Sequence, residues 1–247
     1  MRCVTQARAS DEALIASMRS KNIEMPRQPS TSSERWLVEA FCSEDSQLGK
    51  MGQSFGHQVL RLTKAVNLMS ASGQDLGLTV IKGSDNPFLW GSLPCTPWCH
   101  WQRLNLARGT QKTINKITQA RQESIQALAV FDKLGQAVAE AEGAMAFEWP
   151  TGIEGWQLPE LQHIIEKFQL EKVHFHGCMF GLSAPNGSLM KKAWTVATNC
   201  PELKKALEVH KCDGNHPHFM IQGDLTELSG FYPPEMARTI HQALQQW

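Results

Sequence analysis

Short apolar runs that alternate with helical segments constrain the fold of this chain more than any other feature. The runs 36–41, 58–62 and 88–93 have the length of strands, and polar residues or proline follow each of them. Segment 113–142 carries apolar residues at three- and four-residue steps, which predicts one long helix. Strands that alternate with helices pair in parallel, because each connection crosses back over the sheet. We therefore expect an α/β domain with a doubly wound, mostly parallel sheet.

The same alternation continues to the end of the chain. Strands are expected at 144–147, 173–175 and 194–197, and helices at 159–168, 201–209 and 234–246. The beginning of the chain differs, because 26–33 is a polar stretch rich in serine and proline with little apolar surface to bury. We therefore divide the chain into a flexible N-terminal extension, 1–33, and one domain, 34–247, which ends in a Cys/His loop and a helix.

Composition narrows the range of functions. Lys+Arg and Asp+Glu both number 24, which argues against attachment to nucleic acid or membrane by bulk charge but allows a local basic cleft. No apolar run reaches the roughly 18 residues of a membrane span. Residues 1–10 lack the apolar stretch of a secretory signal. Seven scattered cysteines predict reduced thiols in an intracellular protein rather than a disulfide framework.

The run 93–98, Leu-Pro-Cys-Thr-Pro-Trp, is the most informative short motif. It follows an expected strand, and ligands in parallel sheets bind at the carboxyl ends of the strands. Cys95 at that place is a candidate nucleophile, with its thiol in a cleft and its pKa lowered by dipoles or cations. The alternative is a small buried cysteine, which is the commoner fate of a free cysteine.

Further motifs accompany this run and together resemble the cytosine-C5 methyltransferases, which use S-adenosylmethionine. Pro94, Cys95 and Pro97 match the Pro-Cys-Gln-Pro run around the nucleophile of that family, with Trp98 in place of Phe. Glu148, after the next expected strand, stands where the family has a Glu-Asn-Val motif. Each match is short, and their order along the chain carries the resemblance.

Two more segments follow the same order. The run 38–43, Val-Glu-Ala-Phe-Cys-Ser, resembles the acidic-Leu-Phe-Ala-Gly cofactor turn of the family. The segment 180–182, Phe-Gly-Leu, with Lys191 and Lys192 before a strand, resembles its Tyr-Gly-Ile-Pro-Gln-Lys-Arg turn. The chain is also similar to methyltransferase-like segments of mobile-element polyproteins, which share a Leu-Trp-x-Ser-x-Pro-Cys-Thr-x-Trp run and a later Lys-Lys-x-Trp. Partners could then include other domains of such a polyprotein.

The resemblance implies a Rossmann-like domain of the class I methyltransferase type that methylates a nucleobase, with DNA or RNA as substrate. Cys95 would attack C6 of a flipped cytosine, and Glu148 would hold the base edge and help to protonate N3. Lys192, or Lys191, would orient the base or a phosphate, although a solvated turn is an equal alternative. The side chains expected at the cofactor are Glu39, Phe41, Cys42, Ser43, Asn67 and Pro94.

Departures from the family leave other functions open. The expected cofactor turn lacks glycines, and 61–63, Arg-Leu-Thr, offers no acid for ribose hydroxyls at the end of the second strand. About fifty residues follow Ala197, too few for a separate target-recognition domain. The second hypothesis is therefore a non-catalytic binding or assembly module. A third is a cysteine hydrolase that pairs Cys95 with His100, for which no third orienting group is evident.

A separate cluster near the C-terminus suggests a metal. Thiolate and imidazole groups at the spacing of Cys200, Cys212, His216 and His218 can close a tetrahedral zinc site. The turn 213–215, Asp-Gly-Asn, would bring Cys212 near the histidines. The alternative is a polar loop with incidental histidines, and Cys178 is expected in the core.

Overall fold

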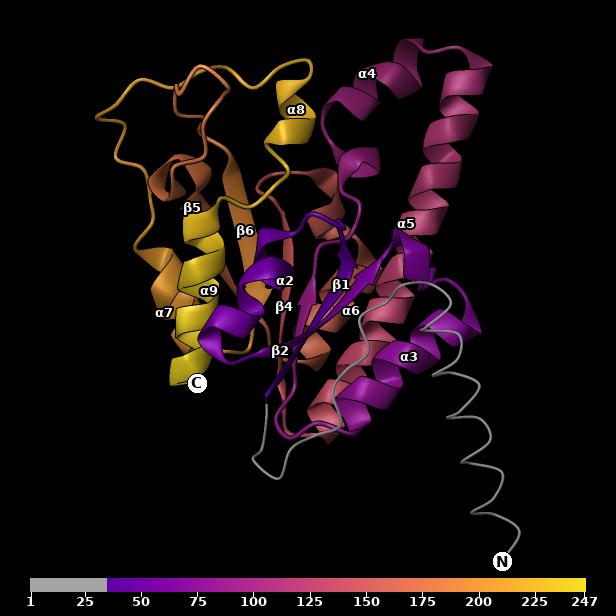
Figure 1. Ribbon diagram of the computed structural model, residues 1–247. Helices are drawn as coiled ribbons and strands as arrows, with labels where there is room; N and C mark the ends of the chain where they lie inside the picture. The colour runs from indigo at the N-terminus through magenta and orange to yellow at the C-terminus, as the bar shows by residue number, and fades with distance from the viewer. Residues whose placement is uncertain (1–34) are drawn as a thin grey trace, which may run out of the picture.

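A six-stranded sheet with strand order β2-β1-β3-β4-β6-β5 forms the centre of the computed structural model, which describes residues 35–247 (Figure 1). The strands are β1 (Trp36–Cys42), β2 (Gln58–Thr63), β3 (Phe88–Gly91), β4 (Ala144–Pro150), β5 (Glu171–His176) and β6 (Ala193–Thr198). Neighbouring strands from β2 to β4 are parallel, whereas β6 runs antiparallel to both β4 and β5. The expected extension 1–33 lies outside the described residues.

Helices cover both faces of this sheet. The helices are α2 (Gln47–Met51), α3 (Ala71–Lys82), α4 (Trp101–Arg108), α5 (Gln111–Glu140), α6 (Pro159–Lys167), α7 (Pro201–Glu208), α8 (Leu225–Leu228) and α9 (Pro234–Gln246). The short 3₁₀ helices are η1 (Gly52–Phe55), η2 (Lys64–Val66), η3 (Thr96–Trp98), η4 (Glu154–Gln157) and η5 (Gly177–Phe180). The buried side chains of α3, α5 and α6 pack on one face and those of α2, α7 and α9 on the other (Figure 1). The expected α/β class with a mostly parallel sheet is confirmed.

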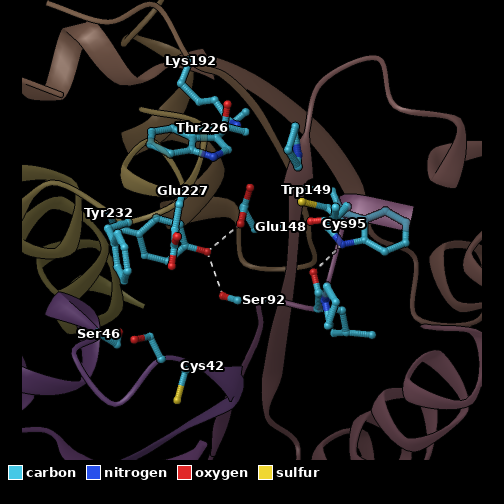
Figure 2. A pocket seen from close by; sticks show the side chains of 18 of the residues that line it. Cys42, Ser46, Ser92, Cys95, Glu148, Trp149, Lys192, Thr226, Glu227 and Tyr232 are labelled. Atoms are coloured by element: carbon cyan, nitrogen blue, oxygen red, sulfur yellow. Dashed lines mark hydrogen bonds between the residues drawn. The ribbon is translucent and has the colours of Figure 1, made fainter. Parts of the chain in front are cut away.

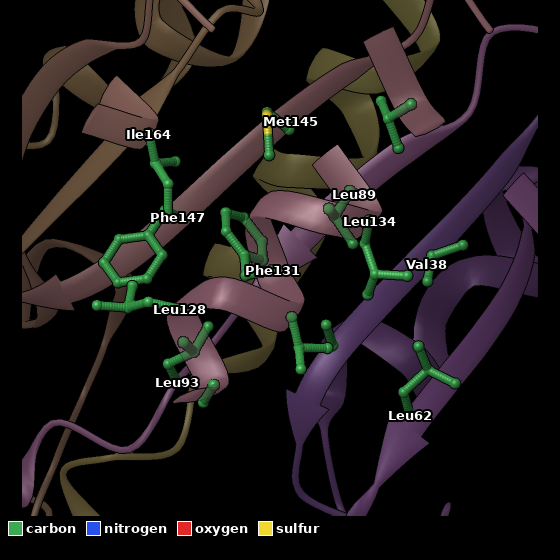
Figure 3. Close-up of a cluster of buried hydrophobic side chains, with 14 of the residues drawn as sticks. Val38, Leu62, Leu89, Leu93, Leu128, Phe131, Leu134, Met145, Phe147 and Ile164 are labelled. Carbon is green, nitrogen blue, oxygen red and sulfur yellow. The ribbon is translucent and has the colours of Figure 1, made fainter. Parts of the chain in front are cut away.

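The core beneath α5 shows why its apolar spacing was informative. Phe131 and Leu134 of α5 point onto the sheet, where Phe131 meets the Phe147 ring edge-on at 5.5 Å between centroids (Figure 3). Gly91 permits this approach, because a Cβ there would lie 2.4 Å from Phe131 Cε2. Burying each such side chain stabilises the fold by about 1.5–3 kcal/mol, so this face is a large part of the folding energy.

Three helices, α2, α4 and α8, were not expected from the sequence. The sequence of α4 carries no apolar stripe, because none of its side chains is buried against the core and an apolar face is not needed. α2 is a five-residue helix that begins at its N-cap Ser46, whose hydroxyl accepts a hydrogen bond from the Gly49 amide. No helix within 35–247 is both long enough and apolar enough to cross a membrane.

The sheet opens a crevice between β1 and β3. The chain passes from β1 to β2 on one side and then returns to β3 on the other side of β1. The loops after β1 and β3 therefore diverge, and ligands of open α/β sheets bind at such a switch point. The candidate site lies there.

Candidate functional site at the carboxyl edge of the sheet

Two adjoining cavities lie at the carboxyl ends of the parallel strands. The cavity beside Cys95, called here the cysteine cavity, has a volume of about 410 Å³. The second, called the β2 cavity because the end of β2 lines it, has about 610 Å³. Both volumes suit small-molecule ligands. The cavities form one cleft because they share the lining residues Cys42, Ser43, Pro94, Glu227 and Phe231.

The residues expected at the site come together in this cleft. Cys95, Glu148 and Lys192 all line the cysteine cavity, although they come from three separate parts of the chain (Figure 2). Of the expected cofactor residues, Glu39, Cys42, Ser43 and Pro94 line the cysteine cavity, and Phe41, Cys42, Ser43, Asn67 and Pro94 line the β2 cavity. Parallel strands explain this, because their carboxyl ends meet at one edge.

Buried tryptophans hold the loop that carries Cys95. Trp149 Nε1 donates to the Leu93 carbonyl at 2.7 Å, and Trp98 Nε1 donates to Ser124 Oγ at 2.9 Å. Cys95 lies between these two anchors, directly before the 3₁₀ turn η3. The tryptophan of the Pro-Cys-Thr-Pro-Trp run thus positions the cysteine by packing against α5.

The electrostatics of Cys95 differ from the expectation of a lowered pKa. Burial, followed by the nearby charge of Glu148, raises the pKa of the Cys95 thiol to about 11, while Lys192 acts in the opposite direction. The thiol is therefore protonated at neutral pH. Any nucleophilic role requires a group that takes this proton.

Glu148 is the group best placed to exchange a proton in the cavity. Its side chain is 7% exposed, and Oε2 accepts a hydrogen bond from Tyr232 Oη at 2.7 Å (Figure 2). Oε1 is buried and has no hydrogen-bond partner within 35–247. Burial raises the pKa of Glu148 to about 7, although the Tyr232 hydrogen bond and Lys192 oppose the rise. An unsatisfied buried oxygen costs free energy, and a ligand in the cavity would satisfy it.

Tyr232 was not expected at the site. Its hydroxyl lies 2.8 Å from Ser92 Oγ and accepts from Trp90 Nε1 at 3.1 Å, so two side chains fix the partner of Glu148. The same segment, after α8, supplies Phe231 to the wall of the cleft. Tyr232 is the single tyrosine of the chain and precedes the two prolines that begin α9. That it is the single tyrosine was the one sequence feature that distinguished this residue.

Glu39, in the middle of β1, forms a second buried carboxyl site. Oε1 accepts from Ser46 Oγ at 2.5 Å, and Oε2 is buried without a hydrogen-bond partner within 35–247. Burial raises the pKa of Glu39 to about 7, against the hydrogen bond from Ser46 and the charge of Arg61. Gly49 allows this packing, because a Cβ there would lie 2.2 Å from Arg61 Cδ.

Of the two expected lysines, Lys192 faces the cleft. It directly precedes β6, and because β6 is antiparallel to β4 its start lies at the carboxyl edge of the parallel strands. Lys192 Nζ reaches Ser229 Oγ at 3.5 Å, whereas Lys191 is exposed. Its charge favours the ionised forms of both Cys95 and Glu148.

The expected metal cluster needs one correction. Cys200 is buried at the N-cap of α7, with its Sγ 3.8 Å from Glu202 Oε2, and it does not join the histidines. Cys178, expected in the core, takes its place beside Cys212, His216 and His218. Because Pro201 begins α7, the chain turns the Cys200 side chain inward at that point.

The chemistry of the cleft has to be judged from its own residues. Three thiols, two buried carboxyl groups with unsatisfied oxygens and two lysines line the connected cavities, and Cys95 is the thiol whose pKa responds to both Glu148 and Lys192. That combination is suited to a ligand with hydrogen-bonding edges and an electrophilic carbon. No known protein family, curated protein or solved structure matches this chain.

Proposed function

We propose that this protein transfers a methyl group from S-adenosylmethionine to C5 of cytosine in nucleic acid, with Cys95 as the nucleophile. The observation that carries the proposal is the meeting of Cys95, Glu148 and Lys192 in one cavity. A thiol, a proton-exchanging carboxyl group and a cation are the side chains that covalent activation of a cytosine ring requires.

The strand order supports a Rossmann-like domain of the class I methyltransferase type. The order reverses between β1 and β3, and the cleft lies at that switch point, where doubly wound folds bind nucleotides. The two cavities give separate room for a cofactor and for a base.

The β2 cavity has the chemistry for a cationic nucleoside. Phe231 and Met69 offer partly exposed apolar surface for a purine, and the Asn67 amide can bond to ribose hydroxyls. The unsatisfied Oε2 of Glu39 and the nearby Glu227 favour positive charge at the boundary of the two cavities. The residues present therefore fit S-adenosylmethionine, which supplies an electrophilic methyl group when bound. The residues differ from the family pattern at the end of β2, where Thr63 and Lys64 stand in place of the acidic residue that contacts the ribose hydroxyls.

Glu148 and Cys95 can share one proton during the reaction. Cys95 Sγ bonds to C6 of the flipped cytosine while its thiol proton passes to Glu148. Glu148 gives a proton to N3, so the C5–C6 and N3–C4 double bonds are replaced by one between C4 and C5. That enamine carbon takes the methyl group. Loss of the C5 proton to solvent then restores the C5–C6 double bond and expels the Cys95 thiolate, and the N3 proton returns through Glu148 to the thiolate. The pKa of Glu148, raised to about 7 by burial, suits both steps near neutral pH.

A basic arm beside the cleft supports a nucleic-acid substrate. The arm, residues 96–122, consists of η3, α4 and the first turns of α5, and its α4 end projects beyond the sheet (Figure 1). It contains no Asp or Glu, and its cations are Arg103, Arg108, Lys112, Lys116 and Arg121. Trp101 on α4 is 73% exposed, as expected for a side chain that stacks on bases. Arg103 and Arg121 both pair with Glu154, so the charge that the arm offers to phosphates comes mainly from Arg108, Lys112 and Lys116.

An oligonucleotide that contains 5-fluorocytosine tests the proposal directly. Fluorine at C5 cannot leave as a proton, so the Cys95 adduct would persist after methyl transfer and would be visible as a mass increase. We expect the adduct only when S-adenosylmethionine is present, never in Cys95→Ser, and normally in the control Cys200→Ser. Methyl transfer without any adduct would exclude the covalent mechanism.

A non-catalytic methyltransferase-like module is the second candidate. The observation that favours it is the turn after β1, where Ser43, Glu44 and Asp45 occupy a place that close cofactor approach usually leaves to glycine. Calorimetric titration with S-adenosylmethionine separates the two functions, since an absence of binding would favour the module. The hydrolase hypothesis gains no support, because His100 is exposed and is not among the residues that line the cysteine cavity.

A further inference from the structure

We propose that Cys178, Cys212, His216 and His218 bind one zinc ion that fastens the segment 210–224 to the body of the protein. Each residue offers one donor atom, and the four donor atoms all lie within 4.8 Å of one another. Two thiolates and two imidazoles are a common set for structural zinc. The proposal is independent of methyl transfer.

The distances agree with a tetrahedral ion. Cys212 Sγ lies 3.4 Å from His218 Nε2 and 3.8 Å from His216 Nε2. Zinc bonds of about 2.3 Å to sulfur and 2.0–2.1 Å to nitrogen place these donors about 3.5 Å apart in a tetrahedron. Small side-chain adjustments would therefore be enough to complete the site.

The backbone around Cys212 is arranged to support a thiolate. The Gly214 amide donates to Cys212 Sγ at 3.4 Å, and Gly214 has φ +84°, a conformation that glycine adopts without strain. The Cys212 amide donates to His176 Nδ1 at 3.0 Å, which fixes the start of the segment on β5. An N–H bond to sulfur stabilises its charged form, as a metal-bound cysteine requires.

The segment 210–224 otherwise has little to hold it. It contains no helix or strand, and none of its residues is buried. It leaves α7 and reaches α8 at the carboxyl edge of the sheet (Figure 1). Long segments without secondary structure or buried side chains need another source of order. A zinc ion shared with Cys178 of η5 would supply it.

The position of the segment gives the ion a structural role. All four coordination positions would be filled by protein atoms, which is typical of structural rather than catalytic zinc. Residues 225–232 follow directly and bring Glu227, Phe231 and Tyr232 to the cleft. Loss of the ion should therefore loosen the wall of the cysteine cavity as well as the segment itself.

Metal analysis of the full chain tests the site. We expect one zinc per chain, and its removal by chelators should be accompanied by uptake of protons on the two freed thiolates. Cobalt should replace zinc and give the intense visible absorption of a tetrahedral Cys₂His₂ site. Cys178→Ser, Cys212→Ser and His218→Ala should each lose the zinc. Cys200→Ser, at an N-cap where serine is favoured, and the exposed His163→Ala should keep it.

The outcomes separate the proposal from its alternatives. Chelation should raise hydrogen exchange over 210–232 and leave exchange in β1 and β3 unchanged. Wild-type protein that binds neither zinc nor cobalt would overturn the site, and so would a disulfide between Cys178 and Cys212 in freshly purified protein. Retention of zinc in folded Cys178→Ser, or its loss in Cys200→Ser, would overturn the ligand assignment.

Discussion

Two buried carboxyl groups line the cysteine cavity from different strands, and they resemble each other closely. Glu39 lies in β1 and Glu148 in β4, and in each a hydroxyl group satisfies one oxygen while the other has no partner within 35–247. Burial raises the pKa of both to about 7. One edge of the sheet therefore carries two buried carboxyl groups with the same hydrogen-bonding arrangement and the same direction of pKa shift.

The neighbours of the two groups differ, and the difference suggests separate tasks. Glu39 faces Arg61, which is fixed opposite it on β2, and the turn that enters α2. Glu148 lies near the Cys95 thiol and the lysine that precedes β6. A fixed counter-charge suits binding, whereas a neighbouring thiol suits proton exchange. We therefore assign Glu39, on the β1 side of the cysteine cavity, to cofactor binding and Glu148 to the reaction.

The largest expected effect comes from Cys95→Ser. A serine hydroxyl at neutral pH is far less nucleophilic than a thiolate, so methyl transfer should fall below detection while cofactor binding and the fold persist. Transfer of a radioactive methyl group measures it, with Cys200→Ser as the control of unchanged activity. Transfer that persists in Cys95→Ser would indicate a target atom that needs no enzyme nucleophile.

Glu148→Gln should slow methyl transfer by about 10²- to 10⁴-fold, the usual contribution of a general acid–base. The amide keeps the shape of the side chain but cannot carry the proton between Cys95 and N3. The dissociation constant of S-adenosylmethionine should stay unchanged, because the partner of Glu148 is the base. If Glu148→Gln lowered cofactor affinity by the same factor as the rate, Glu148 would also bind the cofactor, and the separate roles of Glu39 and Glu148 would be wrong.

Stability against pH provides a third test of the comparison. The unfolded chain loses the Glu148 proton near pH 4.5, whereas the folded protein keeps it until about pH 7. The folded state therefore binds more protons between these values, and stability falls as the pH rises from 4.5 to 7. The loss is about 3 kcal/mol for such a shift. In urea unfolding, Glu148→Gln should match the wild type at pH 4.5 and exceed it at pH 8.

The sequence was sufficient for most of the fold because apolar periodicity reflects burial. The helix 234–246 was predicted with the bounds of α9, and 113–142 differs from α5 by two residues at each end. α4 was not predicted because it packs no side chain into the core and so has no apolar periodicity. The antiparallel direction of β6 could not be predicted, since strand direction depends on tertiary pairing rather than on local pattern.

The site was predictable where strand ends supplied it. Cys95 follows β3 and Glu148 lies in the last part of β4, the parallel neighbour of β3, so their meeting follows from topology. Tyr232 comes from the far end of the chain, and only the packing of α9 brings it to Glu148. Cys200 was wrongly placed among the metal ligands because it is nearer to the histidines in sequence, whereas Cys178, which is buried as expected, is nearer in space.

Glu39→Gln should weaken S-adenosylmethionine binding by about tenfold, or about 1.4 kcal/mol. The substitution removes the negative charge of the ionised carboxyl group, which favours a cationic ligand. Because burial raises the pKa of Glu39 to about 7, the effect should be larger at pH 8 than at pH 6. The rate at saturating cofactor should change little, in contrast to Glu148→Gln. Calorimetry and steady-state kinetics measure the two effects. Equal binding by the wild type and Glu39→Gln would place the cofactor elsewhere in the cleft.

The smallest effect concerns the basic arm, which borders the cysteine cavity but not the β2 cavity. Lys112 and Lys116 are exposed and one helical turn apart, so they present charge on one face of α5. Charge reversal of each should weaken nucleic-acid binding several-fold and lower the slope of log affinity against log salt by about 1. Lys82→Glu, at the end of α3 and beside a cavity lined by different residues, is the matched control. Fluorescence anisotropy over a salt series measures these affinities. Because no residue of the arm lines the β2 cavity, S-adenosylmethionine affinity should be the same in all three variants, and an equal loss in Lys82→Glu would show that the arm has no special part in binding.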